Sequence, residues 1–166
     1  EDTSNVFIEA ALFDPVRTAM SGRKHNLISD ARYRFERGVD PDAVFSGMEL
    51  ATQLVLALCG GEASELVVAG AVPDWQRQVE FRPTRVHQLV GLDVPEDECV
   101  KALTALGFGV THHDAGVTID VPSWRRDIDG EADLVEEVTR IIGYDKIPTV
   151  PLEKDRAVTR RALNGP

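Results

Sequence analysis

The sequence has few cysteines and no long hydrophobic run, and both features limit the classes of protein it can belong to. It contains two cysteines, Cys59 and Cys99, and no CxxC pair. Each lies alone in an apolar helical pattern, which favours two buried thiols in a reducing, cytoplasmic compartment over a disulfide. No apolar run approaches the roughly 20 residues that cross a bilayer, so we expect no membrane span. No methionine starts the chain, which we therefore expect to be a piece of a longer protein.

Motifs for nucleophilic or phosphate chemistry are also absent. There is no glycine-rich phosphate loop, no Ser/His/Asp order and no Cys/His metal spacing, and the four histidines are scattered. The net charge is −10, whereas a stand-alone nucleic-acid binder needs a positive field to collect phosphates. Any RNA contact of this chain must therefore be local or assisted by a partner.

The first 72 residues predict a strand, a basic loop, a helix and a second strand. Residues 5–13 and 64–72 are short and mostly apolar, as buried strands are. Residues 16–38 are predicted as a long loop with about one helical turn, whose seven cationic or imidazole side chains either pair with nearby acids or meet RNA phosphates. A helix capped by Asp40 is expected to end at Gly60-Gly61. Its apolar stripe consists of Val44, Met48, Ala51, Val55 and Leu58.

After a linker at Pro73-Asp74, the apolar pattern restarts and predicts a second unit. The expected elements are a strand over 78–82, helices over 83–90 and 93–106, hairpin strands over 108–112 and 117–121, an irregular crossing over 122–130 and a helix over 131–142. We expect Trp124 in the core beneath the last helix and His112-His113 at the surface. The apolar stripe of that helix is expected to bury Leu134, Val135, Val138, Ile141 and Ile142. The fold class is therefore α+β, and the order of elements in the second unit resembles a winged-helix variant.

Six carboxylates fall within eleven residues at the start of the last helix: Asp127, Asp129, Glu131, Asp133, Glu136 and Glu137. Asp133, Glu136 and Glu137 have i, i+3, i+4 spacing, so they share a helix face away from the apolar stripe, and Asp127 can fold back toward it. Clustered oxygen ligands suit Mg²⁺ or Ca²⁺. Acids at a helix N-terminus also complement the helix dipole while staying solvated, and the spacing leaves both interpretations open.

Glu9 is a single carboxylate inside the apolar stretch VFIEAALF. A buried carboxylate needs a partner. One interpretation pairs Glu9 with an arginine of residues 17–37. In the other, Glu9 faces a pocket and binds a polar group of a ligand.

Three stretches resemble the beta subunit of bacterial phenylalanine–tRNA ligase: SDARYRFERGVDP (29–41), LVGLDVP…ALGFGV (89–110) and VPSWRRDIDGEADLVEEVTRIIGYDKIP (121–148). The resemblance covers about residues 5–150. It implies that residues 1–72 are the C-terminal part of the editing domain, that residues 73–150 form a small winged-helix-like, DNA-binding-like domain with a β-hairpin, and that residues 151–166 are a linker or tail. The ATP-binding catalytic module belongs to the alpha subunit, so this chain alone is expected to be inactive.

The resemblance also implies roles for individual residues. In the family, one set of acidic positions holds magnesium at the boundary with the alpha subunit; the matching residues are Asp127, Asp133, Glu136 and Glu137. Glu9 matches a glutamate that recognises the hydroxyl of mischarged tyrosine. Ser29 and Ala31 match two small residues of that editing pocket.

The implied partners and cofactor follow from the same resemblance. They are the alpha subunit, in an alpha2beta2 tetramer, the phenylalanine tRNA of the whole enzyme, and Mg²⁺ that is weakly bound or absent in this chain alone. The alternative from another class is a stand-alone winged-helix nucleic-acid-binding module built from residues 73–150. The net charge of that unit, −7 from 15 acidic and 8 basic residues, speaks against this alternative.

Overall fold

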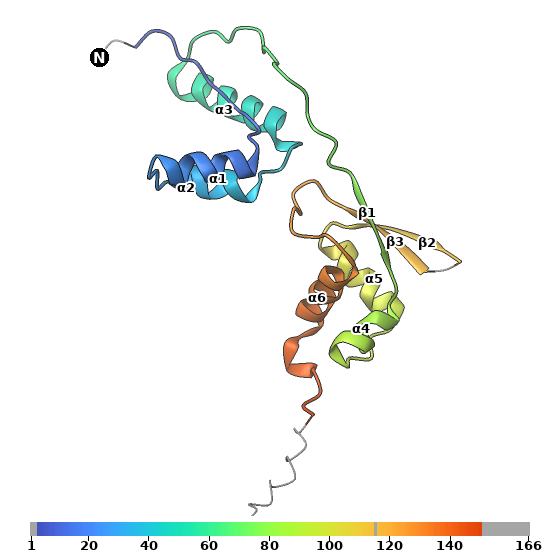
Figure 1. Cartoon of the computed structure of the whole chain (residues 1–166). Helices are drawn as coiled ribbons and strands as arrows, with labels where there is room; N and C mark the ends of the chain where they lie inside the picture. The colour runs from blue at the N-terminus through green and yellow to red at the C-terminus, as the bar shows by residue number, and fades with distance from the viewer. Residues whose placement is uncertain (1–2, 115, 151–166) are drawn as a thin grey trace, which may run out of the picture.

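The chain has two parts joined by an extended segment (Figure 1). The computed structural model describes residues 3–114 and 116–150. The first part contains α1 (Pro15–Lys24), α2 (Asp30–Arg37) and α3 (Ala43–Cys59). The elements of the second part are β1 (Arg77–Phe81), α4 (Thr84–Val90), α5 (Glu96–Ala105), β2 (Gly109–His113), β3 (Gly116–Val121), α6 (Glu131–Ile142) and a 3-10 turn over Tyr144–Lys146. The predicted α+β class is confirmed, while the tail 151–166 lies outside the described residues.

The basic stretch 16–38 forms two helices, so the predicted loop is wrong. Asp14 caps α1, because its carboxylate accepts a hydrogen bond from the backbone N–H of Arg17 at 2.7 Å. Ser29 caps α2 in the same way, accepting from the N–H of Arg32 at 3.2 Å. These bonds satisfy donors that a first helical turn leaves without partners. The helices are therefore specified by their caps more than by an apolar repeat.

Helices α1 and α2 pack closely because Gly22 has no side chain. A Cβ at Gly22 would collide with the guanidinium of Arg32, which pairs with Glu36 at 3.1 Å and donates to the carbonyl of Leu27 at 2.5 Å. Phe13 meets Phe35 edge to face, with ring centroids 5.1 Å apart. The pairing interpretation of the basic stretch thus holds for Arg32.

Helix α3 forms where the apolar stripe predicts it and ends at Gly60, which has a φ of +73°. The prediction that Asp40 caps it is wrong, because Asp42 occupies the position before the helix and Asp40 instead accepts from the N–H of Asp42 at 3.0 Å in the preceding turn. No residue of α3 is buried, and Leu58 is 82% exposed. Cys59 is exposed as well, so the expected buried thiol is wrong at this position. Among the described residues, no helix is both long and apolar enough to cross a membrane.

Residues 5–13 and 64–72 do not form the strands that the sequence predicts. Both segments lack regular structure, and Phe7 and Val67 are 92% and 86% exposed. A strand needs a neighbour to satisfy its N–H and C=O groups. The described residues offer no such neighbour to either segment, so their apolar side chains remain uncovered.

The second part is built on a three-stranded antiparallel sheet in the order β1-β3-β2. Its strands, its three helices and the hairpin all lie where the sequence predicts them. Val79 and Phe81 alternate inward on β1 and pair with Ile119 and Val117 of β3. Helices α4, α5 and α6 cover this face and contribute buried residues, including Val86, Cys99, Leu103, Leu134, Val135 and Val138. Burial of Cys99, assisted by Glu98, raises the pKa of the thiol to about 11.

Two side chains expected in the core of the second part are instead at the surface. Trp124 is 57% exposed and its ring lies over Gly107, where a Cβ would come within 2.9 Å. Ile128 fills the core position in this crossing. Ile141 is 46% exposed, although the stripe of α6 predicts it inward. His112 and His113 are exposed, as expected.

Candidate functional site

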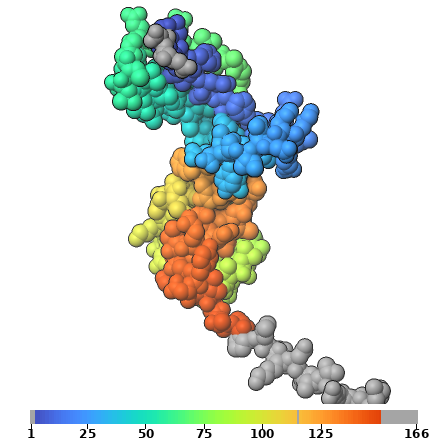
Figure 2. Space-filling view, turned by 90° about the vertical axis from the view of Figure 1, so that its left-hand side faces the viewer, coloured from blue at the N-terminus to red at the C-terminus, as the bar shows by residue number. Residues whose placement is uncertain are grey.

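The acidic cluster lies where the irregular crossing 122–130 meets the N-terminal half of α6 (Figure 2, orange). The start of α6 is fixed by Asp133, whose Oδ2 accepts from the backbone N–H groups of Asp129 and Gly130 at 2.8 and 2.9 Å. Because Gly130 has no side chain to cap the helix, the carboxylate of Asp133 provides this closure. Asp133 is therefore engaged in holding the turn.

Arg125 bridges two acids of the cluster. Its Nε and Nη2 donate to both oxygens of Asp127 at 2.8 and 2.6 Å, and Nη2 also lies 3.1 Å from Oε1 of Glu137. Arg140, one turn along α6, donates to Oε2 of Glu137 at 2.5 Å. Glu137 is 8% exposed, so the expectation that it lies away from the buried side of α6 is wrong. Its burial is tolerated because two cations pair with it.

These contacts shift the pKa of every group in the bridge. The hydrogen bonds from Arg125 hold the pKa of Asp127 below its ordinary range. Burial alone would raise the pKa of Glu137, but Arg125 and Arg140 outweigh burial and lower it. The bond to Asp127 correspondingly raises the pKa of Arg125. Arg125, Asp127 and Glu137 are thus all charged at neutral pH, and the positive charge of the arginine offsets the two negative charges in part.

The four residues predicted to hold a metal do not form a metal site in this arrangement. Asp127 and Glu137 are neutralised by Arg125, Asp133 caps α6, and Glu136 is exposed. Within the described ranges, which include all four residues, no three His, Cys, Asp or Glu side chains are grouped to hold an ion.

Two further acids and their partners join the crossing and α6 to the sheet, and the sequence reasoning missed these pairs. The carboxylate of Glu131 accepts two hydrogen bonds from Arg82, one from Nη2 at 2.7 Å and one from the backbone N–H at 2.9 Å. Asp129 accepts from Arg77 at 2.8 Å. The only signal for these pairs was opposite charge, because the partners lie about 50 positions apart in the sequence. Asp129 and Glu131 therefore tie the crossing and the start of α6 to residues in and beside β1.

The predicted editing-pocket residues are all exposed. Glu9 lies in the irregular N-terminal segment and makes neither hydrogen bond nor ion pair with another described residue, so its pairing with an arginine is wrong. Ser29 caps α2 and Ala31 lies in its first turn. A Ser29 hydroxyl that holds a helix start is less available to a ligand than the sequence suggests.

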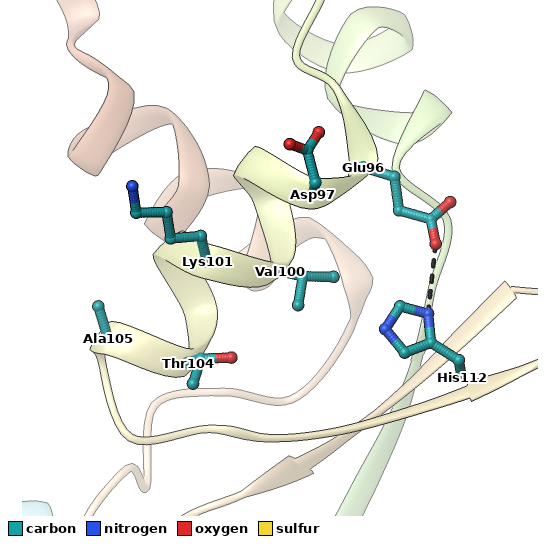
Figure 3. A pocket seen from close by; sticks show the side chains of 7 residues that line it. All are labelled: Glu96, Asp97, Val100, Lys101, Thr104, Ala105 and His112. Carbon is teal, nitrogen blue, oxygen red and sulfur yellow. Dashed lines mark ion pairs between the residues drawn. The ribbon is translucent and has the colours of Figure 1, made fainter.

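An open groove of about 770 Å³ lies between α5 and β2 (Figure 3). Val100 and Ala105 contribute apolar surface, while Glu96 and Asp97 lie at one end. Glu96 pairs with His112 at 3.3 Å. The first turn of α5 carries three consecutive acids, residues 96–98, which repel phosphates. This face of the hairpin unit therefore does not favour the stand-alone nucleic-acid-binding alternative.

Comparison with known proteins identifies both parts of the chain. The family model described as tRNA synthetase B5 domain matches residues 79–144, and the B3/4 domain model matches residues 1–60. Phenylalanine–tRNA ligase beta subunits from Paramagnetospirillum magneticum, Rhodospirillum rubrum and Mesorhizobium japonicum are 54%, 55% and 48% identical over 93%, 93% and 98% of this chain. The chain spans about a fifth of the length of these curated relatives, from 19% to 20%. The chain thus belongs to the phenylalanine–tRNA ligase beta-subunit family, with a B3/4 stretch followed by a B5 domain.

Proposed function

We propose that this chain acts as a non-catalytic part of a phenylalanine–tRNA ligase, a ligase that charges tRNA with phenylalanine. The observation that carries the proposal is the identity of about half its residues, over almost its whole length, to beta subunits of that enzyme. No motif of ATP or acyl-transfer chemistry occurs in the sequence. The charging reaction would therefore take place on an alpha subunit, with which this chain assembles as alpha2beta2.

The proposed division of the chain places the break between residues 72 and 73. Residues 1–72 would be the C-terminal part of an editing domain, and residues 73–150 a winged-helix-like domain. Segment 61–76, which has neither helix nor strand, supports a linker there. One hydrogen bond of the linker reaches the first part: Nε1 of Trp75 donates to Oδ1 of Asp42 at 2.8 Å. The helices α4 and α5 followed by the hairpin β2–β3 support the winged-helix likeness.

Magnesium would bind the four acidic residues only in the assembled enzyme. In the chain alone Arg125 occupies the space between Asp127 and Glu137 and supplies their positive charge. Mg²⁺ demands near-octahedral oxygen geometry, which one helix face does not complete. At the boundary with the alpha subunit, groups of that subunit would supply the remaining magnesium ligands. Arg125 would move away from Asp127 and Glu137 there.

Editing of mischarged tyrosine is the proposed role of the first part. An apolar phenylalanine pocket rejects an added hydroxyl only modestly, so a second, hydrolytic site improves accuracy. Glu9 would accept the hydrogen bond of the tyrosine hydroxyl, an interaction that phenylalanine lacks. The exposure of Glu9 and of nearby Phe7 supports a pocket that another segment of a longer beta subunit completes.

In a complete beta subunit assembled with its alpha subunit, Glu9→Ala should reduce deacylation of tyrosine-charged tRNA by at least about tenfold. Charging with phenylalanine should not change, because the charging chemistry is proposed for the alpha subunit. Both rates are measured with radiolabelled amino acids on the purified enzyme. Glu62→Ala, which also removes an exposed acid of the first part, is the matched control.

Three results of this experiment bear on the proposal. Loss of deacylation with normal charging supports the role of Glu9. Unchanged deacylation in the Glu9 variant would refute it. An equal loss of both reactions, with a lowered melting temperature, would show that Glu9 stabilises the fold instead.

A further inference from the structure

A small pocket where the linker meets the second part contains three arginines. It has a volume of about 190 Å³ and lies between residues 73–77 and residues 121–126. The charged residues that line it are Asp74, Arg77, Arg125 and Arg126. One carboxylate oxygen of Asp74, Oδ1, already accepts a hydrogen bond from the backbone N–H of Gln76 at 3.2 Å. The pocket therefore has an excess of positive charge in a chain that is acidic overall.

The three arginines differ in how far acids neutralise them. Arg125 is held by Asp127 and Glu137, and Arg77 by Asp129 and the carbonyl of Ile128. Arg126, in contrast, is exposed and forms no ion pair or side-chain hydrogen bond with any residue in the ranges 3–114 and 116–150. Its side chain passes beside Gly38, where a Cβ would lie 3.7 Å from its Cγ and Nε. Arg126 thus brings an uncompensated guanidinium to the pocket.

Ser123 supplies an independent sign of a ligand. The residue is 6% exposed and lines the pocket, yet its hydroxyl has no hydrogen-bond partner in the described part of the chain. That part contains no fully buried side-chain oxygen or nitrogen without a partner, so the Ser123 hydroxyl keeps some accessible surface in a residue that lines the pocket. A nearly buried polar group is normally hydrogen-bonded. A donor of this kind beside a free guanidinium suits an anion with several acceptor oxygens.

We propose that the pocket formed by Ser123, Arg126 and the free N–H groups of Arg77 and Arg125 binds a phosphate group. Planar guanidinium groups match the oxygen geometry of phosphate, and a volume of about 190 Å³ is large enough for one such group. The phosphate is either that of an RNA backbone or a free phosphate ion. The proposal concerns the chain without an alpha subunit, and it does not rest on the proposed ligase function because it is argued from the contacts of these four residues.

The proposal is tested by titrating the 166-residue chain with inorganic phosphate. The backbone amide NMR signals of residues 73–77 and 121–126 report the binding. Saturable shifts are expected in both segments. Arg126→Ala should weaken phosphate binding at least about tenfold and Ser123→Ala about fivefold, because each removes a donor to a charged acceptor. Arg126→Lys should retain part of the affinity, since it keeps the charge and loses the planar donor pair. Arg17→Ala, at an exposed arginine of α1 whose side chain likewise has no described partner, is the matched control and should bind phosphate normally.

A short single-stranded RNA distinguishes the two sources of phosphate. Binding that is tighter than that of inorganic phosphate, falls with salt and depends on Arg126 assigns the pocket to an RNA backbone. Affinity for RNA no greater than for inorganic phosphate, with the same dependence on Arg126, assigns it to a free ion. Circular dichroism of each variant confirms that it is folded. No saturable binding of either probe, or binding equally strong in folded Arg126→Ala and Ser123→Ala, would overturn the proposal.

Discussion

Replacing Phe81 by alanine should lower the free energy of unfolding of the second part by about 3–5 kcal/mol. Phe81 is 1% exposed and pairs with Val117 on the covered face of the sheet. Its loss removes buried apolar surface and leaves a cavity between the sheet and the helices, which cannot fully close. A domain of this size has about 5–15 kcal/mol of stability in total. Urea denaturation followed by far-ultraviolet circular dichroism measures the change.

The same substitution at Phe7 is the matched control. Phe7 is 92% exposed, so Phe7→Ala should change the free energy of unfolding by less than about 0.5 kcal/mol. If the two variants lost similar stability, the core would not lie between the sheet and helices α4, α5 and α6.

Replacing Arg125 by alanine should destabilise the second part by about 1–3 kcal/mol. Removing one partner of a fully buried ion pair costs about 3–5 kcal/mol, and the remaining exposure of these side chains, 16% for Arg125 and 11% for Glu137, reduces that figure. Glu137 would keep Arg140, whereas Asp127 would lose its bidentate partner. Arg82→Ala, which breaks an ion pair whose arginine is 62% exposed, should destabilise the second part much less than Arg125→Ala does.

Magnesium should partly restore the stability of the Arg125→Ala variant and leave the unmodified chain unchanged. With the guanidinium gone, Asp127 and Glu137 repel each other and favour a cation between them, and a ligand that binds only the folded state stabilises it. Thermal unfolding with and without millimolar magnesium measures both effects. An Arg125→Ala variant that magnesium does not stabilise would refute the competition between Arg125 and the ion.

The bridge also gives a pH dependence with a definite sign. The folded-state pKa values of Asp127 and Glu137 are lowered, so the unfolded chain binds more protons than the folded chain as the pH falls. The stabilisation is therefore complete above the ordinary carboxyl pKa of about 4. It is lost as the pH falls through the lower folded-state values, and this acid-dependent part should shrink in the Arg125→Ala variant.

Sequence reasoning succeeded where local signals coincide with tertiary packing. In the second part, Leu134, Val135 and Val138 follow the helical repeat and also form the core, so pattern and burial agree. In the first part they diverge. Helices α1 and α2 start at Asp14 and Ser29, whose capping bonds an apolar repeat does not reveal. The predicted strands at 5–13 and 64–72 depend on pairing partners, which local composition cannot supply.

The acidic cluster illustrates the same limit at the candidate site. Spacing along α6 predicted that Asp133, Glu136 and Glu137 share a face away from the apolar stripe, which the burial of Glu137 contradicts. It could not show that Arg125 folds back onto Glu137, because that contact depends on the path of the irregular crossing. The burial of Glu137 and the exposure of Trp124 follow from the same path. Opposite charge at Arg125 and Asp127 was the one local signal of the bridge.

Assembly with an alpha subunit tests the proposed function most directly. Residues 1–150 would replace the matching stretch of the Paramagnetospirillum magneticum beta subunit, which is 54% identical to this chain, and the chimera would be produced with the alpha subunit of that organism. We expect the two subunits to co-elute as one complex in size-exclusion chromatography and to charge tRNA with phenylalanine. A folded, soluble chimera that does not bind the alpha subunit would contradict the proposal that this chain supports a phenylalanine–tRNA ligase.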